Sequence, residues 1–418
     1  MIYKLKSLTG NNFKIVLSQC VVSAGNFITT VLLARAFELE IFGQFSSIWL
    51  IILFSSSIVM SICIFPMMSN YYQFNEDERH QYIIGTFGTL LFISLLFLFF
   101  ITIAYLILVF FQFNQFMDYI WPTTFCVISI NLQEFTRRAL ITIGNTTMAF
   151  ISDFLTYTLR IIAIIALWYL DNLNLLNTLA ICYLTACLGA LIIFRSLTFD
   201  REGFISNMNF AWLHNRKSAK WLLPAGMMQW TSINLFITAA AFLISPAAVG
   251  IIRICQSLLA VLNIILQSAE NIISIQSTKI IKEFGERGLT DYLLKVSFSG
   301  CLPFVFLVVI FHFFGAEIIS LIYGDGYDEV VHHSLVIYAI AYVFVFLIVP
   351  IRAALRTLGK TRSWFNAYLA SSIFSISSFY FLEINFSVYG AVWGILLAHI
   401  VLLTYALFVL YRHINKVL

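Results

Sequence analysis

Long, continuous apolar runs fill nearly the whole of this sequence, and they constrain its fold more than any other feature. Hydrophobic residues make up 61% of the 418 positions, whereas charged residues make up only 11%. A helix needs roughly 20 apolar residues to cross the hydrocarbon core of a bilayer, where every backbone polar group must be bonded internally. The runs do not alternate between apolar and polar residues, which argues against a β-barrel. We therefore predict an all-α integral membrane protein.

The apolar runs divide into twelve predicted transmembrane helices. In the first half we expect spans near residues 13–35, 42–68, 82–111, 117–138, 147–170 and 177–198. In the second half we expect spans near residues 219–244, 247–273, 291–314, 331–356, 363–382 and 388–411.

The distribution of Lys and Arg predicts the orientation, because short cytoplasmic loops carry an excess of positive charge. Basic residues gather at both chain ends and at 137–138, 195–220, 279–287 and 352–362. We therefore expect both termini to face the cytoplasm. Of the 24 basic residues, the exceptions to this bias are Arg35, Arg160 and Arg253.

The two halves of the sequence resemble each other. "RALITIGNT" at 138–146 matches "AALRTLGKT" at 353–361, and we interpret the glycine of each copy as a helix stop. "LLARAFELEIFGQFSS" matches "AAFLISPAAVGIIRICQS", which aligns Gly43 with Gly250. We predict two six-helix lobes, 1–205 and 206–418, related by a parallel repeat, with a substrate site between them and alternating access. This organisation indicates a transporter, with no ATP-binding domain or cofactor, and not an enzyme.

The predicted fifth span carries ionisable groups at bilayer depth, where they are costly enough to indicate function. Asp153, Tyr157 and Arg160 share one helix face at i, i+4 and i+7. The alternative is that Asp153 and Arg160 form a structural pair. Glu134 and Arg138 are spaced as a local i, i+4 pair.

The predicted eighth span carries a polar stripe that suits the wall of a wet cavity. We assign substrate binding to Arg160 and to this stripe, with Arg35 a weaker candidate because a side chain at a helix end reaches the surface easily. The candidate substrate-binding residues are Arg160, Arg253, Arg35, Gln256, Asn263 and Gln267. Arginine suggests an anionic solute, because its guanidinium matches phosphate oxygens. Asp153 and Glu270 are candidates for a coupling cation. The alternative for Arg253 is a structural pair with a distant acid. No cysteine and histidine spacing suggests a metal site.

Several segments resemble the polysaccharide transporter family, the Wzx-type flippases of the multidrug/oligosaccharidyl-lipid/polysaccharide (MOP) exporter superfamily. The resemblance rests on "LLARAF", the following "FGQFSSIW" and "RRALITIGNT". It implies a MATE-like, V-shaped pair of bundles in the bacterial inner membrane. It also implies that an undecaprenyl-diphosphate-linked oligosaccharide is flipped from the cytoplasmic to the periplasmic leaflet for O-antigen, lipopolysaccharide or capsule assembly. The cavity arginines would then contact the pyrophosphate or acidic sugars.

The resemblance further implies membrane lipids, a polysaccharide polymerase and a chain-length regulator as partners, and no nucleic acid. An ion-coupled multidrug antiporter of the same superfamily is the main alternative, although the arginines favour an anionic substrate. A polysaccharide polymerase would need a larger outer loop, and a structural scaffold would not explain the polar stripes.

Overall fold

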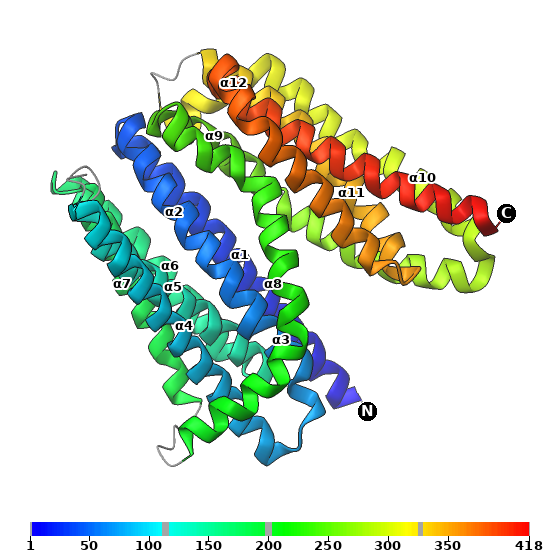
Figure 1. The fold of residues 1–418 in the computed structure, drawn as a ribbon, viewed down its shortest axis with the longest axis horizontal. Helices are drawn as coiled ribbons and strands as arrows, with labels where there is room; N and C mark the ends of the chain where they lie inside the picture. The colour runs from blue at the N-terminus through cyan, green and yellow to red at the C-terminus, as the bar shows by residue number, and fades with distance from the viewer. Residues whose placement is uncertain (1, 111–116, 197–202, 325–328, 418) are drawn as a thin grey trace. The chain divides into compact units, whose positions relative to one another are not determined.

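The computed structural model describes residues 2–110, 117–196, 203–324 and 329–417, and these form helices joined by short turns (Figure 1). The earlier helices are α1 (Ile2–Ala36), α2 (Leu39–Val59), the π-helix η1 (Met60–Ile64), α3 (Phe65–Asn70), the 3₁₀ helix η2 (Tyr71–Gln73), α4 (Glu76–Phe110), α5 (Met117–Ile143), α6 (Thr146–Tyr169), α7 (Leu175–Ala190) and the 3₁₀ helix η4 (Leu191–Arg195). The later helices are α8 (Phe204–Leu243), α9 (Pro246–Ala260), α10 (Asn263–Tyr323), α11 (Glu329–Thr357) and α12 (Thr361–Val417).

The predicted all-α, multi-pass architecture is confirmed. In the described part of the chain, 8 helical stretches are long and apolar enough to cross a membrane. The count of twelve stays a prediction. α5 and α8 are not among the eight because polar and charged residues interrupt their apolar sequences, and α9, with 15 residues, is too short by itself. Residue 111 and residues 197–198 of the predicted spans lie outside the described residues.

Two of the helices each cover parts of two predicted spans. α10 has non-helical backbone at Gly285 (φ 68°), and α12 has it at Ser387 (φ 53°). The predicted span 247–273 is instead divided between α9 and the start of α10. Sequence hydropathy locates apolar stretches, but a single residue with positive φ decides where a helix changes direction.

Gly144 and Gly359, the glycines of the matched segments, both end helices as predicted. Their φ values are +92° and +70°, a region that favours glycine. In both turns the glycine N–H bonds the carbonyl three residues earlier (3.1 and 3.0 Å), and the next N–H bonds the carbonyl five residues earlier (2.8 Å in each). This is the Schellman pattern, so the two copies of the motif have the same local structure.

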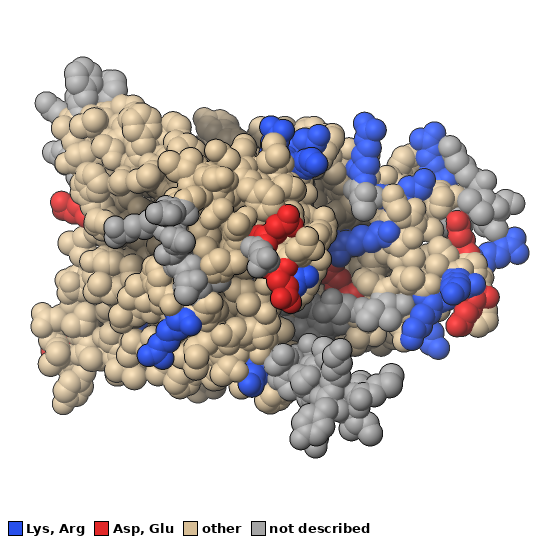
Figure 2. Space-filling view, turned by 90° about the horizontal axis from the view of Figure 1, so that it is seen from below, with Lys and Arg blue, Asp and Glu red and all other residues tan. Residues whose placement is uncertain are grey.

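The surface of the long helices is strongly apolar. On α4, Phe92, Leu95 and Phe99 expose 52%, 62% and 58% of their surface. Most of the face in view in Figure 2 belongs to uncharged residues. Large apolar side chains in such numbers suit contact with lipid tails, whereas on a soluble protein they would favour aggregation.

The chain divides into two compact units. Unit 1 comprises Met1–Leu32 and Ile48–Met227, and unit 2 comprises Leu33–Ser47 and Met228–Leu418. The predicted lobe boundary between residues 205 and 206 stays a prediction, as does the repeat.

Unit 1 has a core formed by the helices from α2 to α5. α5 also packs against α6 and α7. Tyr82, Ile64, Met67 and Phe135 are among its fully buried side chains. These residues come from α4, η1, α3 and α5, respectively. The π-helix η1 therefore packs in the core of unit 1 together with α3, α4 and α5.

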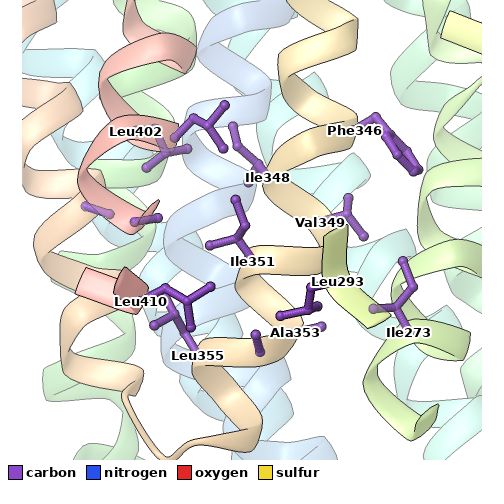
Figure 3. Close-up of a cluster of buried hydrophobic side chains, with 14 of the residues drawn as sticks. Ile273, Leu293, Phe346, Ile348, Val349, Ile351, Ala353, Leu355, Leu402 and Leu410 are labelled. Carbon is purple, nitrogen blue, oxygen red and sulfur yellow. The ribbon is translucent and has the colours of Figure 1, made fainter. Parts of the chain in front are cut away.

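Unit 2 has its own core, in which α11 packs against α9, α10 and α12. Figure 3 shows side chains of α11, including Phe346, Ile348 and Val349, close to Leu293 of α10 and Leu402 of α12. α11 is therefore the central helix of this unit.

The start of α2 belongs to unit 2, where it meets the start of α9. A Cβ atom on Gly43 would collide with the backbone carbonyl of Pro246, and one on Gly250 would lie 2.9 Å from the carbonyl oxygen of Leu39. Gly43 of α2 and Gly250 of α9, which the sequence repeat aligns, therefore both allow the close approach of these two helices.

Candidate functional site

Asp153 on α6 is the centre of a buried polar network in unit 1. Its side chain is fully buried. One carboxylate oxygen accepts a hydrogen bond from the hydroxyl of Ser18 on α1, and the other accepts one from Gln133 Nε2 on α5 at 2.9 Å. The carboxylate therefore ties three helices together.

Arg137 on α5 is the charge partner of this network. Its Nε lies 3.9 Å from Asp153 Oδ1, and its Nη2 donates to both oxygens of Glu134 at 2.8 and 2.9 Å. Its Nη1 donates to Gln19 Oε1 at 3.1 Å. Arg138 Nε also donates to Glu134 at 2.8 Å, which confirms the predicted local pair. The structural alternative for Asp153 named the wrong arginine, because the partner is Arg137 and not Arg160.

Arg160 on α6 is buried, with 2% of its surface exposed, yet it makes no salt bridge to any described residue. Its guanidinium carbon lies 5.1 Å from the ring centre of Tyr157 and 5.9 Å from that of Trp49 on α2. Its Nε has no hydrogen-bond partner among the described atoms. Aromatic faces attract a cation, but they leave its hydrogen-bonding capacity unused.

Arg253 on α9 begins a chain of polar contacts within unit 2. Its Nη1 donates to Gln256 Oε1 at 3.3 Å, and Gln256 Nε2 donates to the hydroxyl of Tyr338 on α11 at 2.9 Å. Tyr338 lies beside Tyr342, with ring centres 5.9 Å apart. Tyr342 donates to Asn263 Oδ1 at 3.5 Å. Arg253 forms no salt bridge with a described residue, so no distant acid of the described chain pairs with it.

The structure thus brings together three of the predicted residues in unit 2, which are Arg253, Gln256 and Asn263. The side chain of Gln267 lies outside the described residues. The tyrosines of this group were not predicted, because their positions on α11 become relevant only when α11 packs against α9.

Glu270 on α10 is held by two arginines of α11. It accepts a hydrogen bond from Arg352 and one from Arg356 Nη1 at 2.8 Å. Arg352 also lies over the ring of Trp364, 5.7 Å from its centre. Both residues proposed for ion coupling, Asp153 and Glu270, are therefore near arginines, and their predicted roles stay predictions.

Arg35, at the end of α1, caps the C-terminal end of α10. Its Nε and Nη2 donate to the carbonyl oxygens of Ile322 and Leu321 at 2.7 and 2.6 Å. These carbonyls belong to the last turn of α10, which has no helical N–H groups to satisfy them. The side chain is exposed, and its contacts are those of a helix cap. Its predicted role in substrate binding stays a prediction.

Glu383 on α12 is a buried acid that the sequence analysis did not identify. Its side chain is 1% exposed, and neither carboxylate oxygen has a hydrogen-bond partner among the described atoms. The sequence feature that could have identified Glu383 is that it is the single acid in the apolar stretch "FYFLEINF". We placed this residue in the loop between the predicted spans 363–382 and 388–411.

The charges of these groups follow a pattern. Glu134, Asp153 and Glu270 each have an arginine nearby, whereas Arg160 and Arg253 have no acid nearby in the described part of the chain. A buried charge without a partner is unfavourable. Arg160 is thus a buried cation and Arg253 a half-buried one, neither with an acidic partner among the described residues, and Glu383 is a buried acid with no described partner.

Comparison with solved structures finds likenesses over nearly the whole chain. Lipid II flippase MurJ in an inward closed conformation gives a TM-score of 0.70 at 14% identity, covering 95% of this chain and 87% of that chain. An inward-facing multidrug resistance MATE family transporter of the MOP superfamily gives 0.72 at 10% identity, covering 94% and 95%. A MOP superfamily transporter from Pyrococcus furiosus gives 0.58 at 11% identity, covering 98% and 96%.

No protein-family model and no curated protein matches the sequence. At these identities the structural likeness shows the fold alone. The chain has the helical fold of the MOP-superfamily transporters.

Proposed function

We propose that this protein is a flippase that moves an undecaprenyl-diphosphate-linked oligosaccharide, of the kind used in O-antigen or capsule assembly, across the bacterial inner membrane by alternating access. The observation that carries the proposal is the presence of two arginines in apolar helices, Arg160 and Arg253, without acidic partners among the described residues. A lipid-linked sugar diphosphate is an anion whose lipid tail stays in the bilayer while its headgroup crosses.

The chemistry of the two arginines supports an anionic substrate. A guanidinium group offers several N–H donors in a plane that matches phosphate oxygens, and it stays charged in any protein environment. Arg160 has an unpartnered Nε, and Arg253 has a 3.3 Å contact with a neutral amide. Neither side chain must lose an ion pair to bind a pyrophosphate or an acidic sugar.

The polar groups near Arg253 support recognition of a sugar. Tyr338 and Tyr342 offer hydroxyls and ring faces, and Gln256 and Asn263 offer amides. Aromatic faces with hydrogen-bonding groups suit a ligand that has both apolar and hydroxylated surfaces. We assign the sugar units to this group and the pyrophosphate to the arginines.

The fold likeness supports the transporter class, because the similar structures are described as a lipid II flippase and as multidrug transporters. The second candidate is an ion-coupled multidrug antiporter. Glu383 is the observation that favours it, because a buried acid without a partner could accept a cationic group.

Deletion of the gene followed by complementation tests the proposal. We expect the deletion strain to lose its surface polysaccharide and to regain it with the wild-type gene. Arg160→Ala and Arg253→Ala should each lower polysaccharide export by about tenfold, the loss expected for one charge-assisted hydrogen bond. Lys282→Ala, which removes an exposed cation on α10, is the matched control and should export normally.

Membrane levels of each variant must match the wild type for this comparison. A deletion strain that keeps its polysaccharide but loses tolerance to cationic drugs would support the antiporter instead. Full export by both arginine variants would remove the evidence for an anion-binding role.

A further inference from the structure

α8 is too long to lie wholly within a bilayer. It has 40 residues, which at about 1.5 Å per residue is about 60 Å, whereas the hydrocarbon core is about 30 Å thick. Its first half, from Phe204 to Trp221, contains the polar sequence "SNMN" and the cluster "HNRKSAK". This half is therefore the part expected outside the hydrocarbon core.

One face of this first half packs closely against the start of α4. The ring of Phe74 lies 5.3 Å from that of Phe210, and Tyr82 donates its hydroxyl to Asn215. A Cβ atom on Gly85 would collide with the backbone of Asn207, so the two helix backbones are in close contact. Figure 1 shows this half of α8 crossing α4 instead of running alongside it. This half of α8 thus runs across α4, a candidate membrane-spanning helix, and this direction suits a position along the membrane surface.

The opposite face of the same segment is exposed and carries two kinds of side chain. Ile205, Trp212 and Leu213 expose 70%, 45% and 48% of their surface. The cations Arg216, Lys217 and Lys220 follow on the next turns of this exposed face.

An exposed tryptophan ends the segment. Trp221 is 73% exposed, and Lys220 Nζ lies 5.9 Å from the centre of its ring. Between Phe204 and Trp221 the sequence has no Asp or Glu. The exposed face of this segment therefore carries cations and no acid of its own.

We propose that this exposed face of α8, residues 204–221, binds the membrane interface and selects anionic phospholipids. Trp, Leu and Ile side chains insert at the boundary between headgroups and acyl chains, and adjacent Lys and Arg contact lipid phosphates. A basic cluster just before a membrane-spanning segment is attracted to an anionic lipid surface. Exposed apolar side chains and exposed cations lie together on one face, and this combination fits a lipid surface better than a soluble anion. Binding of a soluble anion would leave the apolar side chains in water.

Native mass spectrometry of the full chain in detergent, with added phosphatidylglycerol or phosphatidylcholine, tests this proposal. We expect the wild type to retain phosphatidylglycerol in preference to phosphatidylcholine. The triple variant R216Q/K217Q/K220Q should bind phosphatidylglycerol at least about fivefold more weakly. The double variant W212Q/L213Q should weaken the binding of both lipids, because it removes the apolar part of the contact.

The matched control is K279Q/K282Q/R287Q, which removes the same number of exposed cations from α10, where Glu283 and Glu286 lie among them. We expect it to bind phosphatidylglycerol as the wild type does. Equal loss in both triple variants would overturn the proposal by showing a general charge effect. Competition by inorganic phosphate at millimolar concentration would also overturn it, because the site would then be one for a free anion. All substituted residues are exposed, and a melting temperature equal to that of the wild type checks that each variant is folded.

Discussion

Arg137 and Arg160 are both buried guanidinium groups of unit 1, but their surroundings differ. Arg137 contacts Glu134 and lies 3.9 Å from Asp153, whereas Arg160 contacts the rings of Tyr157 and Trp49. Removing one partner of a buried ion pair leaves the other charge without compensation. The same type of residue therefore serves stability in one position and is available for binding in the other.

This difference predicts unequal losses of stability. Arg137→Gln should lower the free energy of unfolding by about 3 kcal/mol or more, because it leaves the buried carboxylate of Asp153 without its arginine and leaves Glu134 with Arg138 alone. Arg160→Gln should lower it by only about 2 kcal/mol, the value of a cation–π contact that is shielded from water. Thermal unfolding of the purified variants in one detergent measures both. Equal losses would mean that Arg160 has a structural partner after all.

The sequence identified Asp153, Tyr157 and Arg160 as one face of a helix, because helical spacing depends on a single segment. It did not identify Arg137 as the partner of Asp153, since that pairing depends on how α5 packs against α6. Arg35 illustrates the same limit, because the carbonyls that it binds lie 286 and 287 residues away.

At the scale of helices, the contact between the starts of α2 and α9 depends on glycine. A side chain at Gly43 would collide with the backbone of Pro246, which cannot move without shifting α9. Gly43→Ala should therefore lower the free energy of unfolding by about 1–3 kcal/mol, as overpacking does.

The melting temperature of the purified protein measures this loss. Gly250→Ala should cost less, because its nearest neighbour would be 2.9 Å away and two of the three nearest atoms belong to side chains. Ser47→Ala, one turn further along α2, adds no atom and serves as the control. A melting temperature unchanged by Gly43→Ala would refute the close approach of the two helices.

The break in α12 predicts a substitution that stabilises the protein. Ser387 has φ 53° and ψ −134°, a conformation that costs little for glycine but is unfavourable for other residues. Ser387→Gly should raise the free energy of unfolding by about 1 kcal/mol. Ser377→Gly, at an exposed position inside the same helix, should lower it by about 0.5–1 kcal/mol. Denaturant unfolding of the two variants checks the opposite signs, and a loss at both positions would show that residue 387 is helical.

Most helices could be predicted from sequence because their apolar runs have the length that a bilayer demands. The exceptions have physical causes. α8 begins at Phe204, well before the predicted span at 219–244, because the polar residues of its first half lower the mean hydropathy of that segment. The breaks inside α10 and α12, at Gly285 and Ser387, fall within the predicted loops 274–290 and 383–387, so in these two cases the sequence located the change of direction although the helix assignment continues through it.

In the molecule as a whole, each of the two units contains an arginine without a described acidic partner, and the surroundings of that arginine differ between the units. Unit 1 has a cation among aromatic rings, at Arg160, and unit 2 has one beside an amide and two tyrosines, at Arg253. In unit 1 the acids Glu134 and Asp153 lie beside arginines, and in unit 2 Glu270 does. The numbers of charged residues, 24 basic and 20 acidic, do not predict this pattern. It depends on which basic residue packs beside which acidic residue in the folded chain.

We propose that this chain moves an anionic, lipid-linked glycan from one leaflet to the other. Reconstitution of the purified protein in vesicles that contain a fluorescent undecaprenyl-diphosphate-linked oligosaccharide tests this movement. In empty vesicles, a membrane-impermeant quencher should reach only the label in the outer leaflet, which is about half of the total. In vesicles with the wild-type protein, it should reach nearly all of the label. An R160A/R253A variant should resemble the empty vesicles. Quenching that stops at the outer leaflet with the wild-type protein, in vesicles that exchange a cationic dye, would contradict the account.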